Sequence, residues 1–173
     1  MARLDADDAP VPNPRERRDR RGSTAEHERC QLWRQDAAAL IQLLATATRI
    51  ACTGITGSGL TALQASLDQA RAIPRIYWER RAAAHAEFLN ALADAAGDPQ
   101  LTPVFSSGAG FAYDLMITAG SAADGIVINS RKRLLAHLCA GDADEVTAEM
   151  EDHFRILQVM GRLAVPTGQR ASA

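Results

Sequence analysis

Apolar residues recur along most of this 173-residue chain at steps of three and four, the spacing of an α-helix with one buried face. Glycine, proline and short polar residues separate the stretches that carry this repeat, so we expect short connections between helices. The repeat predicts helices over about 23–52, 60–70, 74–96, 100–119, 121–141 and 142–164. Together they predict an all-α fold, an antiparallel bundle of six to seven helices.

Local signals refine where these helices begin and end. Asp142 and Glu145 fit a capping box at the start of the last helix. Pro74 is expected in the first turn of the third helix, where its missing N–H costs nothing, and Gly97 at the end of that helix. The glycine-rich residues 53–59 lack the Gly-Lys-Ser/Thr ending of a phosphate-binding loop, and no strand precedes them. They predict a turn.

The amino-acid composition favours a helical domain, and the net charge does not indicate binding to nucleic acid or to an anionic membrane. Alanine and leucine, both strong helix formers, dominate a hydrophobic fraction of 47%, whereas aromatic residues make up 5%. A formal net charge of −2 provides no overall attraction to nucleic acid or to an anionic membrane. Residues 1–22 combine prolines with an arginine-rich run and are expected to be disordered, ahead of a helical domain at 23–165 and a flexible tail at 166–173.

The cysteines and the start of the chain bear on the compartment. Cys30, Cys52 and Cys139 are far apart and odd in number, so they predict neither a disulfide framework nor a thiolate zinc site. The first residues are charged rather than apolar, unlike a secretory signal. We identify no apolar run that approaches the roughly 20 residues of a membrane span. The chain is therefore expected to be cytoplasmic, with no membrane partner.

Three ionisable residues interrupt the apolar faces of three predicted helices. His85 lies midway along the apolar face of the third helix, Arg131 on that of the fifth and His153 on that of the sixth. Buried charge is costly unless it is paired or bound, and one shared polar pocket would satisfy all three side chains. The alternative is that each side chain lies at the edge of its stripe and reaches water or a backbone carbonyl.

Several of these residues belong to stretches that resemble a known family. Residues 85–89, His-Ala-Glu-Phe-Leu, followed by Gly-Asp-Pro at 97–99, are similar to the Asp-x-x-Phe-His and Gly-Asn-Pro signatures of the FCD domain. This is the C-terminal effector domain of FadR-type GntR transcription regulators. Gly-Asp-Ala at 141–143 and His153 are similar to the second half of the signature. The resemblance covers about residues 30–160 and implies the fold of the FadR C-terminal domain.

In the FCD family a metal is often held by the Asp and His of the first motif and by two histidines of the second. The resemblance places these four positions on His85, Leu89, Arg131 and His153. Leu89 cannot ligate a metal and Arg131 repels a cation, which leaves at most His85 and His153. A stable zinc-type site needs three or four ligands, so we expect a degenerate site and no metal cofactor.

The resemblance implies a domain that binds a small ligand at these same four positions, because family members commonly sense organic acids and other anionic metabolites. The guanidinium of Arg131 suits a carboxylate or a phosphate, with His85 and His153 assisting. A structural salt bridge from Arg131 to a nearby aspartate is the alternative. The resemblance also implies a homodimer, or a heterodimer with a full-length GntR-type regulator.

The winged helix-turn-helix that usually precedes this domain has no counterpart in residues 1–22, so we expect no direct DNA binding by this chain. It is then a stand-alone effector domain, a truncated regulator or a partner of a full-length relative. A pure dimerisation module predicts an apolar patch and no pocket. A small enzyme would use His85, His153 and Asp114 for acid–base chemistry, but no nucleophile motif accompanies them. The chain is not expected to be an enzyme.

Overall fold

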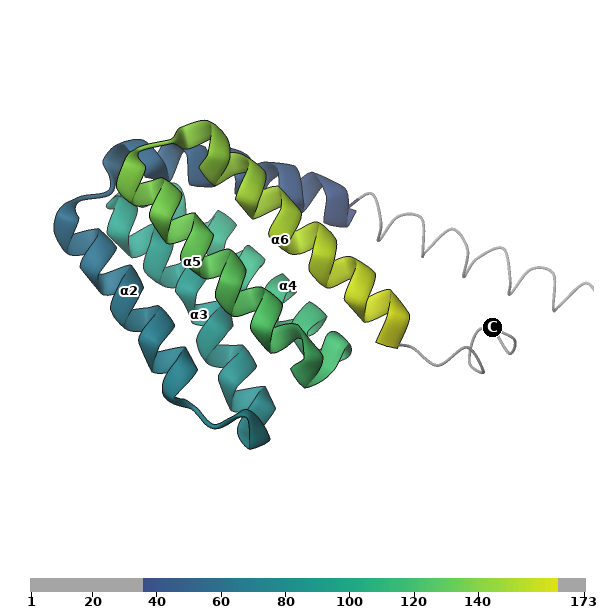
Figure 1. Ribbon diagram of the computed structural model, residues 1–173. Helices are drawn as coiled ribbons and strands as arrows, with labels where there is room; N and C mark the ends of the chain where they lie inside the picture. Colours follow the sequence, from purple (N-terminus) through teal and green to yellow (C-terminus); the bar gives the residue numbers. More distant parts are fainter. Residues whose placement is uncertain (1–35, 165–173) are drawn as a thin grey trace, which may run out of the picture.

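A computed structural model describes residues 36–164, which fold into an all-α bundle (Figure 1). No strand occurs within that range, which confirms the all-α class. The first helix is described over Asp36–Gly54. The elements that follow are α2 (Gly57–Ala72), the 3-10 helix η1 (Arg75–Tyr77), α3 (Trp78–Ala96), α4 (Thr102–Ala119), the 3-10 helix η2 (Gly120–Ala123), α5 (Asp124–Ala140) and α6 (Ala143–Ala164).

The predictions for the ends of the chain fall outside the described residues. They are the disordered segment 1–22, the helix start near residue 23 and the tail at 166–173. The same holds for Cys30, whereas Cys52 and Cys139 are free thiols.

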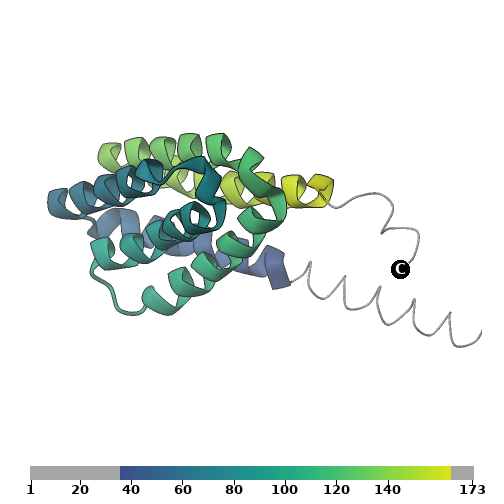
Figure 2. The same ribbon diagram turned by 90° about the horizontal axis from the view of Figure 1, so that it is seen from below.

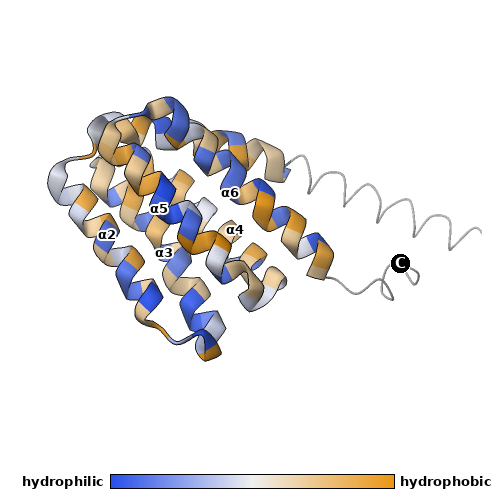
Figure 3. Ribbon diagram, viewed as in Figure 1, coloured by the Kyte–Doolittle hydropathy of each residue, from blue (hydrophilic) through white to orange (hydrophobic). Residues whose placement is uncertain are grey.

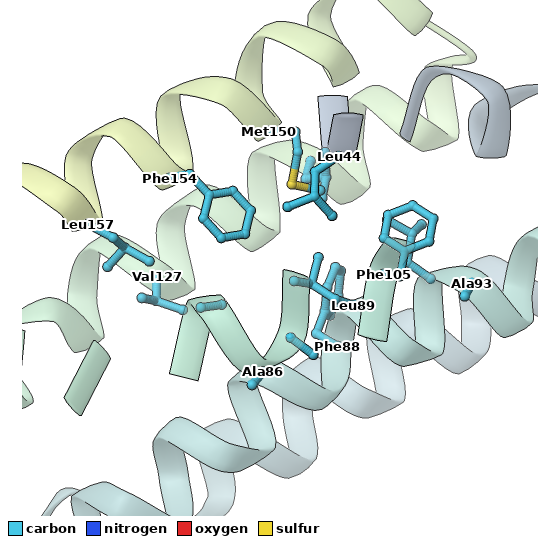
Figure 4. Packing of buried hydrophobic residues seen from close by; sticks show 14 of the residues in the cluster. Leu44, Ala86, Phe88, Leu89, Ala93, Phe105, Val127, Met150, Phe154 and Leu157 are labelled. Atoms are coloured by element: carbon cyan, nitrogen blue, oxygen red, sulfur yellow. The ribbon is translucent and has the colours of Figure 1, made fainter. Parts of the chain in front are cut away.

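The helices pack so that α3 lies between α2 and α4, while α6 contacts α4 and α5. Seen from below, α5 runs along one side of the bundle and α4 along the opposite side (Figure 2). Large apolar side chains from every described helix fill the space between them (Figure 4). They include Leu44, Leu63, Phe88, Leu89, Phe105, Val127, Met150, Phe154 and Leu157.

Several predicted helix ends are confirmed. Asp142 Oδ1 accepts a hydrogen bond from the Glu145 backbone N–H at 3.1 Å, which is one half of a capping box. Gly97 and Gly141 follow α3 and α5 with φ angles of 67° and 69°, the left-handed conformation that favours glycine at this position. These caps fix the direction in which the chain leaves the two helices that carry His85 and Arg131.

Two predicted boundaries are wrong. Pro74 does not open the third α-helix: its ψ angle of 141° is extended, a 3-10 turn follows, and α3 begins only at Trp78. The turn predicted over 53–59 shrinks to Ile55 and Thr56, because helix continues to Gly54 on one side and resumes at Gly57 on the other. Thr56 Oγ1 accepts a hydrogen bond from the Gly59 N–H at 3.2 Å and so caps the start of α2. This cap lets the new helix begin with only two residues between it and the end of the first helix.

Two stretches of the described chain are long and apolar enough to cross a membrane, Asp36–Gly54 and Thr102–Ala140, each with a mean hydropathy of 1.3. They do not stand out as apolar runs in the sequence, because alanine raises their hydropathy without forming a block of large apolar residues. The second stretch is divided at Gly120, where φ is 72° and α4 gives way to η2. Hydrophilic and hydrophobic residues alternate around the helices (Figure 3). Both stretches contribute side chains to the bundle core, so they are weak evidence for a membrane span.

We expect Gly108→Ala to destabilise the protein and Gly110→Ala, two residues along the same helix, to stabilise it. A Cβ on Gly108 would lie 2.5 Å from Leu44 Cδ2, and Leu44 is fully buried, so overpacking is expected to cost about 1–3 kcal/mol. A Cβ on Gly110 meets no atom within 4 Å, so only the gain in helix propensity remains, up to about 1 kcal/mol. Urea unfolding measures both, and equal effects of the two substitutions would contradict this account of α4.

Candidate functional site

His85, Arg131 and His153 all lie in the interior of the bundle. Their exposed fractions are 0%, 1% and 1%, and they come from the middle of α3, α5 and α6. The helical periodicity therefore placed all three on the correct faces, and none lies at the edge of its stripe. Leu89, the fourth predicted pocket residue, is also fully buried, one turn after His85.

The three side chains lie close enough to influence one another. The Arg131 Cζ atom lies 4.7 Å from the centroid of the Phe88 ring, which joins α5 to the turn of α3 that carries His85 and Leu89. The ring of His153 contacts Phe154 edge-on, at 5.3 Å between centroids. Figure 4 shows Phe88, Leu89 and Phe154 in the same region of the core. The charge of Arg131 acts on both histidines and lowers the pKa of each.

Six buried nitrogen atoms of this cluster have no hydrogen-bond partner in the described part of the protein. They are Nε and Nη2 of Arg131 and both ring nitrogens of His85 and His153. Buried polar groups are almost always paired, so six such atoms in three neighbouring side chains are unusual. His85 Nε2 lies 3.5 Å from Asp124 Oδ1, which is too long for an ordinary hydrogen bond. Within residues 36–164, no acidic side chain forms an ion pair with Arg131, so the alternative of a structural salt bridge is not observed there.

Burial and the Arg131 charge keep both histidines neutral at neutral pH. Desolvation, and next the charge of Arg131, lower the pKa of His85 to about 4, although the nearby Asp124 carboxylate opposes this. The same two causes hold the pKa of His153 well below its usual value. Desolvation lowers the pKa of Arg131 to about 9, which still leaves the guanidinium charged at pH 7. The site thus holds one positive charge and two neutral imidazoles, each with one donor and one acceptor nitrogen.

Two ion pairs flank the cluster, and neither was predicted from the sequence. Asp124, at the start of α5, is bound by Arg81 through two contacts of 2.5 and 3.2 Å. Glu149 on α6 is held by Arg133 through contacts of 2.6 and 2.9 Å. A signal was available for two of these residues, because Arg81 and Glu149 each precede a site histidine by four residues and so share its helix face.

The site does not fit the metal of the FCD family. Of the four corresponding positions, only His85 and His153 have side chains that ligate metals. Arg131 on α5 forms no ion pair within residues 36–164, and the nearby Glu149 carboxylate offsets its charge only in part. No group of three or more His, Cys, Asp or Glu suited to a metal occurs within residues 36–164. The residues present favour an anion instead.

The buried cluster is closed to solvent in this conformation. A cavity of about 310 Å³ opens elsewhere, between α4 and α6, where it is lined by Phe111, Leu115, Gly161 and others. Asp114, which the enzyme alternative would pair with the two histidines, lines this cavity and is exposed. It therefore lies apart from the buried His85 and His153. A ligand reaches Arg131 only if the helices around it separate.

Comparison of the chain with protein-family models, with curated proteins and with solved structures found no match in any of the three.

Proposed function

We propose that this chain is a ligand-binding domain whose buried Arg131 receives a small anionic metabolite, an organic acid or a phosphate compound. One observation carries the proposal: a fully buried guanidinium that has no acidic partner among the described residues and two unpaired N–H donors. Leaving a charge in the interior without a partner costs several kcal/mol, so native proteins rarely retain one without a role. An anion bound at Nε and Nη2 supplies the missing charge in the planar geometry that Arg favours.

The two histidines suit the same ligand. A neutral imidazole offers an N–H to an anion and a lone pair to a hydroxyl or acid proton. The negative charge of the ligand also cancels part of the Arg131 field that keeps His85 and His153 unprotonated. Binding is therefore expected to take up protons and to grow stronger as the pH falls from 8 toward 6. Phe88 and Leu89 close the apolar side of the pocket.

The closed state of the site supports a regulatory role rather than a transport or catalytic one. Because all three side chains are buried, entry of the ligand requires α5 or α6 to move, and binding then selects between two conformations. We propose that the chain works in the cytoplasm as an effector domain of the GntR type, without catalysis of its own. The motifs at 85–89, 97–99 and 141–143 support this assignment.

A dimerisation module is the second candidate, and one observation favours it. Ile156, Val159 and Leu163 are exposed and follow each other at steps of three and four on α6, which forms an apolar stripe on the surface. A homodimer, or a heterodimer with a full-length regulator, would cover this stripe. The two functions are compatible, but dimerisation through α6 does not require Arg131. A variant of Arg131 that loses ligand binding and keeps its oligomeric state separates them.

We expect Arg131→Ala to weaken the binding of malonate and inorganic phosphate at least about tenfold, or by about 1.4 kcal/mol. Calorimetric titration measures the affinities, on protein that elemental analysis shows to be free of metal. Lys132→Ala is the matched control, because it removes the same formal charge from an exposed neighbour on α5. Circular dichroism verifies that each variant is folded. Unchanged affinity in the Arg131 variant, absence of binding to the wild type, or stoichiometric metal at the site would refute the proposal.

A further inference from the structure

A single buried carboxylate connects the Arg131 site to an exposed corner of the bundle. Asp124 is 3% exposed, and its carboxylate faces two arginines and one histidine. Arg81 Nε lies 2.5 Å from its Oδ1, Arg75 Nε lies 3.0 Å from its Oδ2, and His85 Nε2 lies 3.5 Å from Oδ1. His85 belongs to the proposed ligand site, whereas Arg75 belongs to η1.

The same cluster holds the chain between α2 and α3 in place. Arg81 Nη1 donates to the backbone carbonyl of Arg71 at 2.9 Å and also to that of Ile73. Arg75 donates to the Ser121 carbonyl at 3.3 Å and so ties η1 to η2. Asp124 thus anchors the corner formed by residues 73–77 at two points: at Ile73, through Arg81, and at Arg75 directly.

This corner presents an unusual surface. Ile76 is 84% exposed and Tyr77 is 60% exposed, although both are large and apolar in character. A surface hollow of about 440 Å³ lies beside them. Trp78 follows directly and donates its indole N–H to the Met116 carbonyl at 3.3 Å. A change in how η1 is held would therefore alter an exposed apolar surface and the surroundings of a tryptophan.

We propose that Asp124 couples occupancy of the Arg131 site to release of the η1 corner, an inference that rests on the proposed function. An anion at Arg131 lets His85 accept one proton from solvent, because the bound negative charge offsets the Arg131 charge that opposes protonation of His85. Protonated His85 has donors on both ring nitrogens, and Nε2 already faces Asp124. The carboxylate turns toward the buried imidazolium. Of its two arginine partners, Arg75 is the one that dissociates, because its side chain is 63% exposed and water replaces the contact.

The proposed coupling and simple Coulomb attraction predict opposite effects of removing Arg75 on anion affinity. If the anion favours the state in which Arg75 is released, then removing Arg75 must strengthen anion binding by the same coupling. Simple Coulomb attraction predicts the reverse, because Arg75→Ala removes a positive charge near the site. We expect Arg75→Ala to tighten the binding of malonate and of inorganic phosphate about threefold or more. Arg71→Ala, which removes an exposed arginine at the end of α2, should change the affinity less than about twofold, in line with the small effects of exposed charges.

A double-mutant cycle and hydrogen exchange complete the test. In a His85→Gln background the Arg75→Ala effect should disappear, because glutamine does not take up a proton. In the wild type, saturating malonate should accelerate amide exchange at residues 75–78. Malonate binding that Arg75→Ala weakens or leaves unchanged, or an effect that persists in the His85→Gln background, would overturn the coupling and leave the proposed function standing. If neither probe binds the wild type, both fail together.

Discussion

Replacing Arg81 with methionine is expected to lower the free energy of unfolding by about 3–5 kcal/mol, the cost of removing one partner from a buried ion pair. Arg81 is 5% exposed and Asp124 3% exposed, so water cannot replace the lost contacts. The substitution leaves Asp124 with the exposed Arg75 and a neutral histidine, and it leaves the carbonyls of Arg71 and Ile73 without this donor. Because small domains are stable by about 5–15 kcal/mol, the variant is expected to be only marginally folded.

Urea unfolding of two further variants identifies the cause of that loss. Arg80→Met replaces the exposed neighbour of Arg81 and should change stability by less than about 0.5 kcal/mol. Adding Asp124→Asn to Arg81→Met should recover part of the loss, because the buried negative charge is gone. If Arg81→Met lowered the free energy of unfolding by less than about 1 kcal/mol, the Arg81–Asp124 ion pair would be no stronger than an exposed one. It would then not hold the corner at residues 73–77 in place.

The sequence predicted the helix faces well because burial repeats with the period of the helix itself. One polar residue on an otherwise apolar stripe, such as His85 or Arg131, is visible as a break in that repeat, and both proved to be buried. Stops at Gly97 and Gly141 were equally visible, since a left-handed residue favours glycine. The start of α3 was not, because Pro74 fits the first turn of an α-helix and the end of an extended connection equally well.

What the sequence did not reveal is which residues meet across the bundle. Arg81 and Asp124 lie 43 positions apart, and no local pattern pairs them. Asp124 is the first residue of α5, but its side chain turns inward to Arg81 instead of capping that helix. Likewise, the sequence left open whether Arg131 had an acidic partner. In the structure, Glu149 is close enough to act on Arg131 electrostatically. Glu149 is occupied by Arg133, which the structure alone shows.

Acidification is expected to destabilise the protein through its two buried histidines. The pKa of His85 is about 4 in the folded state and about 6.5 when the chain is unfolded, so between these values the unfolded state binds the extra proton. Stability therefore rises with pH through this window, is fully present above about pH 7, and is lost as the pH falls below 6.5. From His85 alone, the free energy of unfolding should fall by about 2 kcal/mol between pH 7 and 5. His153 adds to this loss, because its pKa is shifted in the same direction.

Urea unfolding at a series of pH values, on the wild type and on a His85→Gln/His153→Gln variant, isolates this contribution. Other titrating groups are common to both proteins, so the difference between their slopes from pH 7 to 5 belongs to the two histidines. The variant should lose less stability than the wild type over that range, and the difference between them should stop changing above about pH 7.5. Saturating malonate should also reduce the loss in the wild type, since a bound anion stabilises the protonated imidazoles in the folded state. Identical slopes for the two proteins would mean that the histidines become protonated without disturbing the bundle, and that water already reaches the site around Arg131.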